Sequence, residues 1–84
     1  MTVFEEVSNI LKELSVVKKI HLKSNLQNDL GLDSLNLVTL LLEIEEVFNI
    51  ELDESDMNPF ELTDVEHVVW LVEKYRGKEN AEND

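Results

Sequence analysis

The chain has 84 residues, of which 19 are Asp or Glu and 7 are Lys or Arg, giving a formal net charge of −12. This balance argues against nucleic acids and anionic membranes as partners, because both are bound through cationic side chains. The absence of cysteine excludes disulfides, thiolate metal sites and a cysteine nucleophile. We expect a small cytoplasmic monomer of one domain, with no metal site, secretory signal or membrane-spanning segment.

The first part of the chain is expected to form a helix followed by a long loop. Thr2 and Glu5 have the spacing of a capping box and indicate the start of a helix over about residues 3–15. Loops as long as the next segment, 16–33, are uncommon unless they are functional or packed. We expect this loop to pack against the core through four leucines: Leu22, Leu26, Leu30 and Leu32.

Two further helices are expected in the second part of the chain. One runs from Ser34 to about Phe48, and its predicted core face consists of Leu37, Leu40, Leu41, Ile44, Val47 and Phe48. The segment 53–56 can form a short helical turn, and a second capping box over 63–66 opens the last helix. The predicted buried face of that helix consists of Val65, Val68, Val69, Val72 and Tyr75. Residues 77–84 have almost nothing to bury, so we expect a disordered acidic tail.

These patterns predict an all-α fold, a small four-helix bundle with three main helices, one short helix and a long first loop.

The segment Asp29-Leu30-Gly31-Leu32-Asp33-Ser34-Leu35 sets one serine hydroxyl at the start of the second helix. Unsatisfied N–H groups and the positive end of the helix dipole favour an anion there. Asp33 and Ser34 are also residue types that commonly do no more than cap a helix.

Charge is unevenly distributed along the sequence. From Ser24 to Glu73 the chain has thirteen acidic residues and no Lys or Arg, so we expect a cationic partner to dock beside Ser34. A serine without an evident catalytic base in such surroundings indicates a modification site.

The segment around Ser34 resembles the attachment sequence of acyl carrier proteins. The resemblance continues through Glu43-Ile44-Glu45-Glu46-Val47-Phe48 and Leu62-Thr63-Asp64-Val65, and covers about residues 3–76. In that family a phosphopantetheinyl transferase moves 4′-phosphopantetheine from coenzyme A onto the motif serine, here Ser34, which follows Asp33. The thiol of this arm then carries acyl groups as thioesters between enzymes. The resemblance implies a non-catalytic carrier domain over 1–76, serving fatty acid, polyketide or other specialised biosynthesis.

The second helix also presents apolar residues opposite its predicted core face. Leu35, Val38 and Leu42 fall on this outer face, with Glu45 and Glu46 beside them. We interpret these five residues as a partner-binding surface for acyl-transferring or condensing enzymes with basic docking patches. Single exposed leucines are also normal in soluble proteins, and the loop over 16–33 could cover these three.

Some positions depart from the fatty-acid members of the resembled family. Asn36 and Thr39 stand where acids are common, which favours a dedicated biosynthetic pathway over primary fatty acid synthesis. Trp70 is expected on the outer face of the last helix. There it can form a cation–π pair with Lys74 or make an additional contact with a partner.

The sequence is also compatible with two other functions. The first is an acidic helical interaction module without a prosthetic group, which would grip a basic helix through Leu35, Val38 and Leu42. The second is a hydrolase built on Ser34. His21 and His67 are distant from Ser34 in sequence, and neither an oxyanion-hole motif nor a glycine-rich elbow surrounds the serine, so the hydrolase is the weaker hypothesis.

Overall fold

The computed structural model describes the backbone of residues 2–83 and the side chains of residues 2–76. Its three α-helices are α1 (Val3–Leu14), α2 (Ser34–Phe48) and α3 (Val65–Asn83). Two short 3₁₀ helices, η1 (Glu54–Asp56) and η2 (Pro59–Glu61), lie between α2 and α3. The described residues contain no β-strand, so the expected small helical bundle with a long first loop is confirmed.

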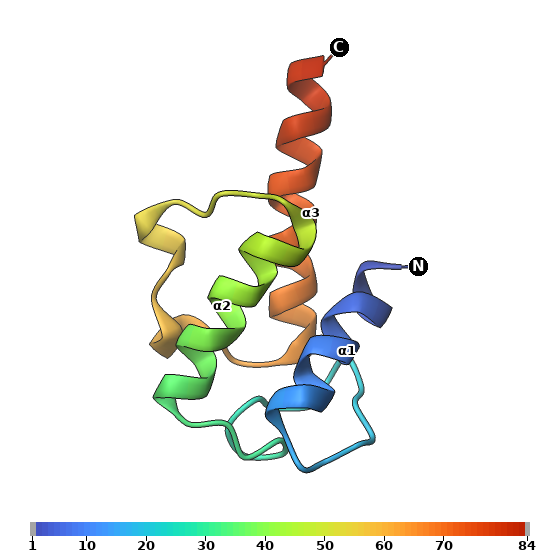
Figure 1. The fold of residues 1–84 in the computed structure, drawn as a ribbon, viewed down its shortest axis with the longest axis vertical. Coiled ribbons are helices and arrows are strands. Elements are labelled where there is room, and N and C mark those ends of the chain that lie inside the picture. Colours follow the sequence, from blue (N-terminus) through green and yellow to red (C-terminus); the bar gives the residue numbers. More distant parts are fainter. Residues whose placement is uncertain (1, 84) are drawn as a thin grey trace.

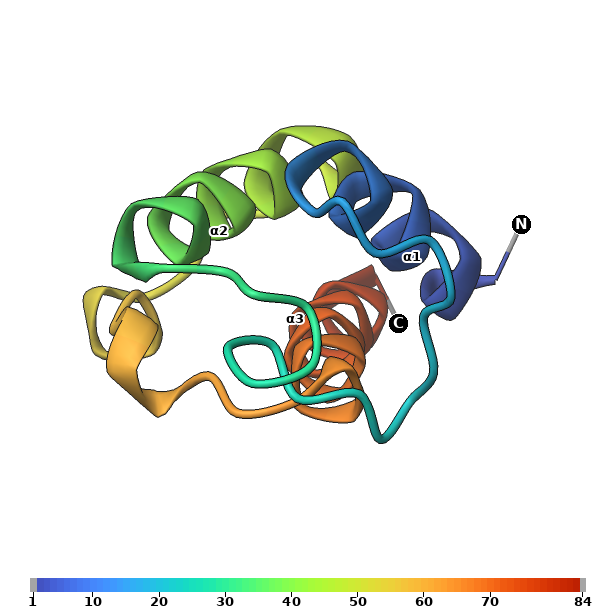
Figure 2. The same cartoon turned by 90° about the horizontal axis from the view of Figure 1, so that it is seen from below.

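The helices enclose one apolar core. Figures 1 and 2 show α1 and α2 packed side by side, with α3 lying against them and the first loop closing the end where α2 and α3 begin. The 3₁₀ segment lies beside α2, and η2 contacts it directly. None of the described helices is both long enough and apolar enough to cross a bilayer.

The end of the last helix differs from the sequence-based expectation. The backbone of α3 is helical as far as Asn83. It therefore continues past Gly77, where the tail was expected to begin. The side chains of 77–84 lie outside the described residues, so the expected disorder of this tail stays a prediction.

Polar contacts define both ends of α1. The Glu5 backbone N–H donates to Thr2 Oγ1 at 3.1 Å and the Thr2 N–H donates to Glu5 Oε1 at 3.2 Å, which confirms the predicted capping box. The helix ends at Leu14. The next residue, Ser15, donates its buried hydroxyl to the carbonyl oxygen of Leu30 at 2.7 Å. This hydrogen bond joins the end of α1 to the segment that precedes α2.

The capping box predicted between Thr63 and Glu66 is wrong, because the residue that caps the last helix is Asp64 and not Thr63. The helix begins at Val65, one position later than expected, and Asp64 Oδ1 accepts the His67 backbone N–H at 2.9 Å. Glu66, expected to complete the box with Thr63, instead extends to the first loop. Its carboxylate lies 2.7 Å from Lys23 Nζ. A partner distant in sequence therefore replaces the local interaction.

The first loop packs on the core largely as predicted. Its buried leucines are Leu26, Leu30 and Leu32. Leu22 was expected among them, but its side chain is exposed and the loop buries Ile20 instead. Leu22 is held through its backbone, because its carbonyl oxygen accepts the Glu66 N–H at 2.9 Å. This contact fixes the loop to α3 without requiring the leucine side chain to be buried.

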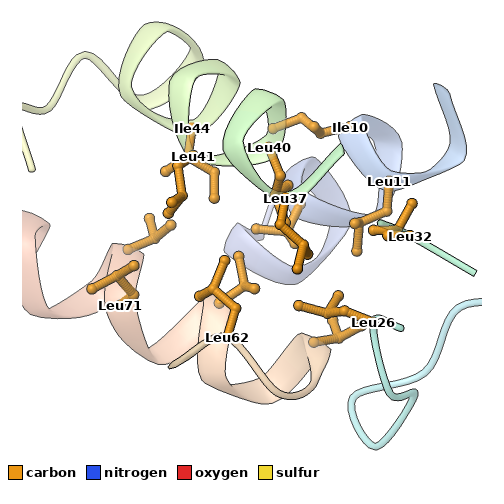
Figure 3. Close-up of a cluster of buried hydrophobic side chains, with 14 of the residues drawn as sticks. Ile10, Leu11, Leu26, Leu32, Leu37, Leu40, Leu41, Ile44, Leu62 and Leu71 are labelled. Atoms are coloured by element: carbon orange, nitrogen blue, oxygen red, sulfur yellow. The ribbon is translucent and has the colours of Figure 1, made fainter. Parts of the chain in front are cut away.

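Figure 3 shows how leucine and isoleucine side chains of α2 meet residues of the other elements in the core. The buried residues of α2 are Leu37, Leu40, Leu41 and Ile44. Val47 was also expected in the core, but it is exposed, because it lies at the edge of this face beside a groove between α1 and α2. Phe48, the last residue of α2, is half-buried.

The buried face of α3 differs in a similar way. Its buried residues are Val65, Val68, Leu71 and Val72. Leu71 was not predicted. With Leu71 included, the face is centred near Val68, which leaves Val69 at its edge and half-buried.

Adjacent leucines of α2 provide a matched test of this packing. Leu41 is 0% exposed and Leu42 is 53% exposed. We expect Leu41→Ala to lower the free energy of unfolding by about 2–5 kcal/mol, because it removes buried contacts and leaves a cavity. Leu42→Ala should cost less than about 1 kcal/mol. Urea unfolding followed by circular dichroism measures both, and equal losses would contradict the assigned faces.

A hydrogen-bond cluster centred on Tyr75 holds the 3₁₀ segment on α3. The Tyr75 hydroxyl donates to Asp56 Oδ2 and accepts the Asp53 backbone N–H at 2.9 Å. Lys74 Nζ lies 3.2 Å from the same Asp56 oxygen. The Tyr75 hydrogen bond, assisted by Lys74 and opposed by burial, lowers the pKa of the Asp56 carboxyl below its usual value. Burial, followed by the hydrogen bond to Asp56, raises the pKa of Tyr75.

The stabilisation from this cluster should depend on pH. We expect Tyr75→Phe to lower the free energy of unfolding by about 1 kcal/mol at neutral pH. A carboxyl group whose pKa is lowered by folding stabilises the protein at pH values above its pKa in the unfolded chain, here 3.8. This stabilisation is lost as the pH falls through the lower pKa of the folded state. The difference between wild type and Tyr75→Phe should therefore shrink below about pH 4 in urea unfolding. In an Asp56→Asn background it should stay constant over this acidic range. A difference of equal size at acidic pH in both backgrounds would contradict the role of Asp56.

Candidate functional site

The turn before α2 is held by both polar and apolar contacts. Asp29 Oδ2 accepts the Asn25 backbone N–H at 2.7 Å, which closes the turn. Leu30 and Leu32 then insert their side chains into the core. The Leu32 backbone N–H also donates to the carbonyl oxygen of Leu26 at 3.0 Å. These contacts fix the path of the chain immediately before α2.

Gly31 allows the chain to change direction between its two buried neighbours. Its φ is +70°, a left-handed conformation that side-chain-bearing residues adopt only with strain. A Cβ atom at this position would meet no heavy atom within 4 Å, so the requirement for glycine comes from the backbone conformation and not from crowding. The same observation shows that the space beside Gly31 is open.

Asp33 caps α2, as the simplest interpretation of its residue type suggested. Its Oδ1 accepts the Asn36 backbone N–H at 2.8 Å, and Asn36 Oδ1 accepts the Asp33 N–H at 3.2 Å. The Asp33 carbonyl oxygen accepts the Leu37 N–H at 3.0 Å. Asn36 thus completes a capping box with a neutral side chain, at a position where acids are common in the resembled family.

Ser34 is the first residue of α2, and it is exposed. Within the described residues its hydroxyl makes no hydrogen bond, so the oxygen is accessible. The N–H groups of Ser34 and Leu35 have no acceptor inside the helix, because they belong to its first turn. An accessible oxygen, two unpaired donors and the open space beside Gly31 fit a phosphoryl-linked group on Ser34.

The apolar residues predicted on the outer face of α2 are exposed. Leu35 is 77% exposed, Val38 39% and Leu42 53%, so the first loop does not cover them. Glu46 is exposed beside them. Glu45 is half-buried, and its Oε2 accepts the Leu52 backbone N–H at 2.9 Å. One Glu45 oxygen is therefore engaged in holding the next segment, and the partner-binding role of these residues stays a prediction.

Phe60 is a further exposed aromatic residue that sequence reasoning missed. It lies on η2, which contacts α2, and its side chain is largely exposed. Figure 1 shows η2 beside the end of α2 at which Ser34 lies. The local signal was Asn58-Pro59, which starts this turn: Asn58 Oδ1 accepts the Phe60 N–H at 3.0 Å.

Trp70 lies on the outer face of α3 as expected. Lys74 Nζ is 5.5 Å from the centroid of its ring system, which confirms the predicted cation–π pair. The His67 ring centroid lies 5.9 Å from that of Trp70. No hydrogen bond within the described residues joins His67 or His21 to Ser34. The described residues also contain no group of three His or acidic side chains arranged to hold a metal ion.

Comparison with known proteins gives consistent matches over most of the chain. Residues 2–70 match the family described as "Phosphopantetheine attachment site". The acyl carrier protein of Coprothermobacter proteolyticus is 40% identical, over 84% of this chain and 87% of the relative. That of Campylobacter concisus is 38% identical, over 88% and 96% respectively. That of Cyanidium caldarium is 35% identical, over 94% and 93%.

Proposed function

Because the chain belongs to the acyl carrier proteins, non-catalytic carriers with a covalent 4′-phosphopantetheine group, we propose that Ser34 bears this group. One contrast supports the assignment. Asp29, Gly31 and Asp33 are each required by the turn or by the helix cap, whereas the exposed Ser34 hydroxyl makes no hydrogen bond within the described residues. The motif thus presents one oxygen that the fold does not use.

The start of α2 provides a suitable environment for a phosphodiester on Ser34. Its charge would be stabilised by the helix dipole by about 0.3–1 kcal/mol, with the Ser34 and Leu35 N–H groups directed outward. Asp33 Oδ1 is occupied by the Asn36 N–H, which keeps this carboxylate at the helix cap. When bound, the arm supplies the thiol that carries an acyl group as a thioester.

The outer face of α2 is the proposed docking surface for enzymes that load or use the arm. Leu35, Val38 and Leu42 supply apolar area, and Glu46 together with the second oxygen of Glu45 supplies negative charge. Partners with basic patches, including a phosphopantetheinyl transferase and acyl-transferring or condensing enzymes, would be steered towards this surface. The carboxylates would increase the association rate more than the final affinity.

We also propose that residues 1–76 form the carrier domain and that the protein acts as a cytoplasmic monomer. Its pathway is fatty acid, polyketide or other specialised biosynthesis. Asn36 supports a specialised role, because this neutral side chain in the cap of α2 stands where the fatty-acid members commonly have an acid. Membership of a non-catalytic, arm-bearing family removes the basis for two alternatives, the hydrolase and the module without a prosthetic group.

The attachment site is tested by co-expression with a phosphopantetheinyl transferase. We expect the intact mass of the wild-type chain to increase by one arm, and Ser34→Ala to abolish the increase. Ser55→Ala, at an exposed serine of η1, should leave the increase unchanged. Circular dichroism should show that Ser34→Ala is folded. Modification of Ser34→Ala, or no modification of wild type by any such transferase, would contradict the assignment.

The docking surface is tested by the kinetics of the same transferase. We expect Leu42→Ala to lower kcat/KM for modification by about five- to tenfold, because an apolar contact with the enzyme is lost. Leu22→Ala removes a comparably exposed leucine from the first loop and should have little effect. Added salt should lower kcat/KM further by screening the carboxylates. Equal effects of the two leucine substitutions would place the docking surface elsewhere.

A further inference from the structure

A second surface feature lies away from the site at Ser34. A groove of about 520 Å³ is formed between α1 and the first-loop segment 18–21. Figure 2 shows this loop running along α1 on the side away from α2. The groove is therefore separate from the proposed docking surface.

The groove concentrates positive charge in an otherwise acidic protein. Lys12, Lys18 and Lys19 line it, together with His21. The chain has 7 Lys and Arg in total, so three of them meet at this one place. Glu5 is the acidic residue among the lining side chains, and its Oε1 accepts hydrogen bonds in the capping box of α1.

A buried hydroxyl without a partner also lines the groove. Ser8 is 6% exposed, and its Oγ is the one buried side-chain N or O atom in the described residues that has no hydrogen-bond partner. A buried hydroxyl group lowers the stability of the fold unless it forms a hydrogen bond with the protein, with water or with a ligand. Ser8 lines the groove but its Oγ is shielded from solvent, so a ligand there can accept its hydrogen bond once the side chain rotates about χ1 to face the groove.

Two of the lysines are available to a ligand. Lys18 Nζ donates to the Lys12 carbonyl oxygen at 2.9 Å, so this ammonium group offsets the negative carbonyl end of α1. That end would otherwise repel an anion. The ammonium groups of Lys12 and Lys19 make no ion pair within the described residues, and both side chains are exposed.

We propose that this groove binds a phosphate ester. Its phosphate would accept hydrogen bonds from the Ser8 hydroxyl and from the Lys12 and Lys19 ammonium groups. The lysine ammonium group binds phosphate as a compact positive charge, and a phosphate ester offers three oxygens that accept hydrogen bonds. The volume exceeds what a phosphate ion alone needs, and the half-buried Phe4 and the buried Ile20 provide an apolar wall for the organic part.

The test is a titration of the full ¹⁵N-labelled chain at constant ionic strength, in the unmodified and the arm-bearing form. The probes are inorganic phosphate and phenyl phosphate. We expect saturable shifts of amide signals confined to residues 4–12 and 18–21 in both forms. Phenyl phosphate should bind roughly tenfold more tightly, because its ring removes apolar surface from water. Equal affinity for both probes would overturn the assignment to an ester.

Matched variants separate a site from general attraction between charges. We expect Lys12→Gln and Ser8→Ala each to weaken phenyl phosphate binding about five- to tenfold. Ser8→Ala should melt no lower than wild type, because the hydroxyl has no partner to lose. Lys23→Gln, at an exposed lysine outside the groove, should leave affinity unchanged. Equal effects of Lys12→Gln and Lys23→Gln, or shifts spread over the whole chain, would overturn the proposal.

Discussion

The burial of Leu30 and Leu32 on either side of Gly31 determines where α2 begins. Both side chains enter the core, and the left-handed backbone of Gly31 makes this possible over three consecutive residues. With Leu32 fixed, Asp33 is positioned to cap the helix, and Ser34 becomes its first residue. The hydroxyl of Ser34 is therefore accessible as a consequence of how the preceding leucines pack. The position of the proposed attachment site is set by core packing.

The charges of the molecule are arranged in two regions with different consequences. The outer face of α2 combines apolar side chains with carboxylates, which suits encounters with cationic proteins. The groove beside α1 is lined by three lysines and by Ser8, whose hydroxyl has no hydrogen-bond partner within the described residues. Since α1 separates this groove from α2, an anion bound there would leave the docking surface uncovered. The same small fold can thus present surfaces of opposite charge without one obstructing the other.

Sequence reasoning predicted the features that depend on neighbouring residues. The cap formed by Thr2 and Glu5, the start of α2 and most of its core face follow from local spacing. Errors at the edges of the helix faces concern Val47 and Val69, and two others arose where a residue distant in sequence determines the contact. Glu66 pairs with Lys23 across the fold, so it does not cap α3. Leu22 is held by its backbone and needs no burial. The motif around Ser34 could be recognised in the sequence, but the groove at Ser8 could not, because its residues converge only after folding.

The division of tasks within the motif has a consequence for how this sequence can change. Losing Gly31 would strain the turn, and losing Asp33 would remove the cap of α2. Losing Ser34 would disturb neither, because its side chain supports nothing in the described fold. A duplicated gene copy without this serine would therefore still encode a well-folded bundle with an intact outer face on α2. Such a copy could compete for the same enzymes as a natural decoy while delivering no cargo.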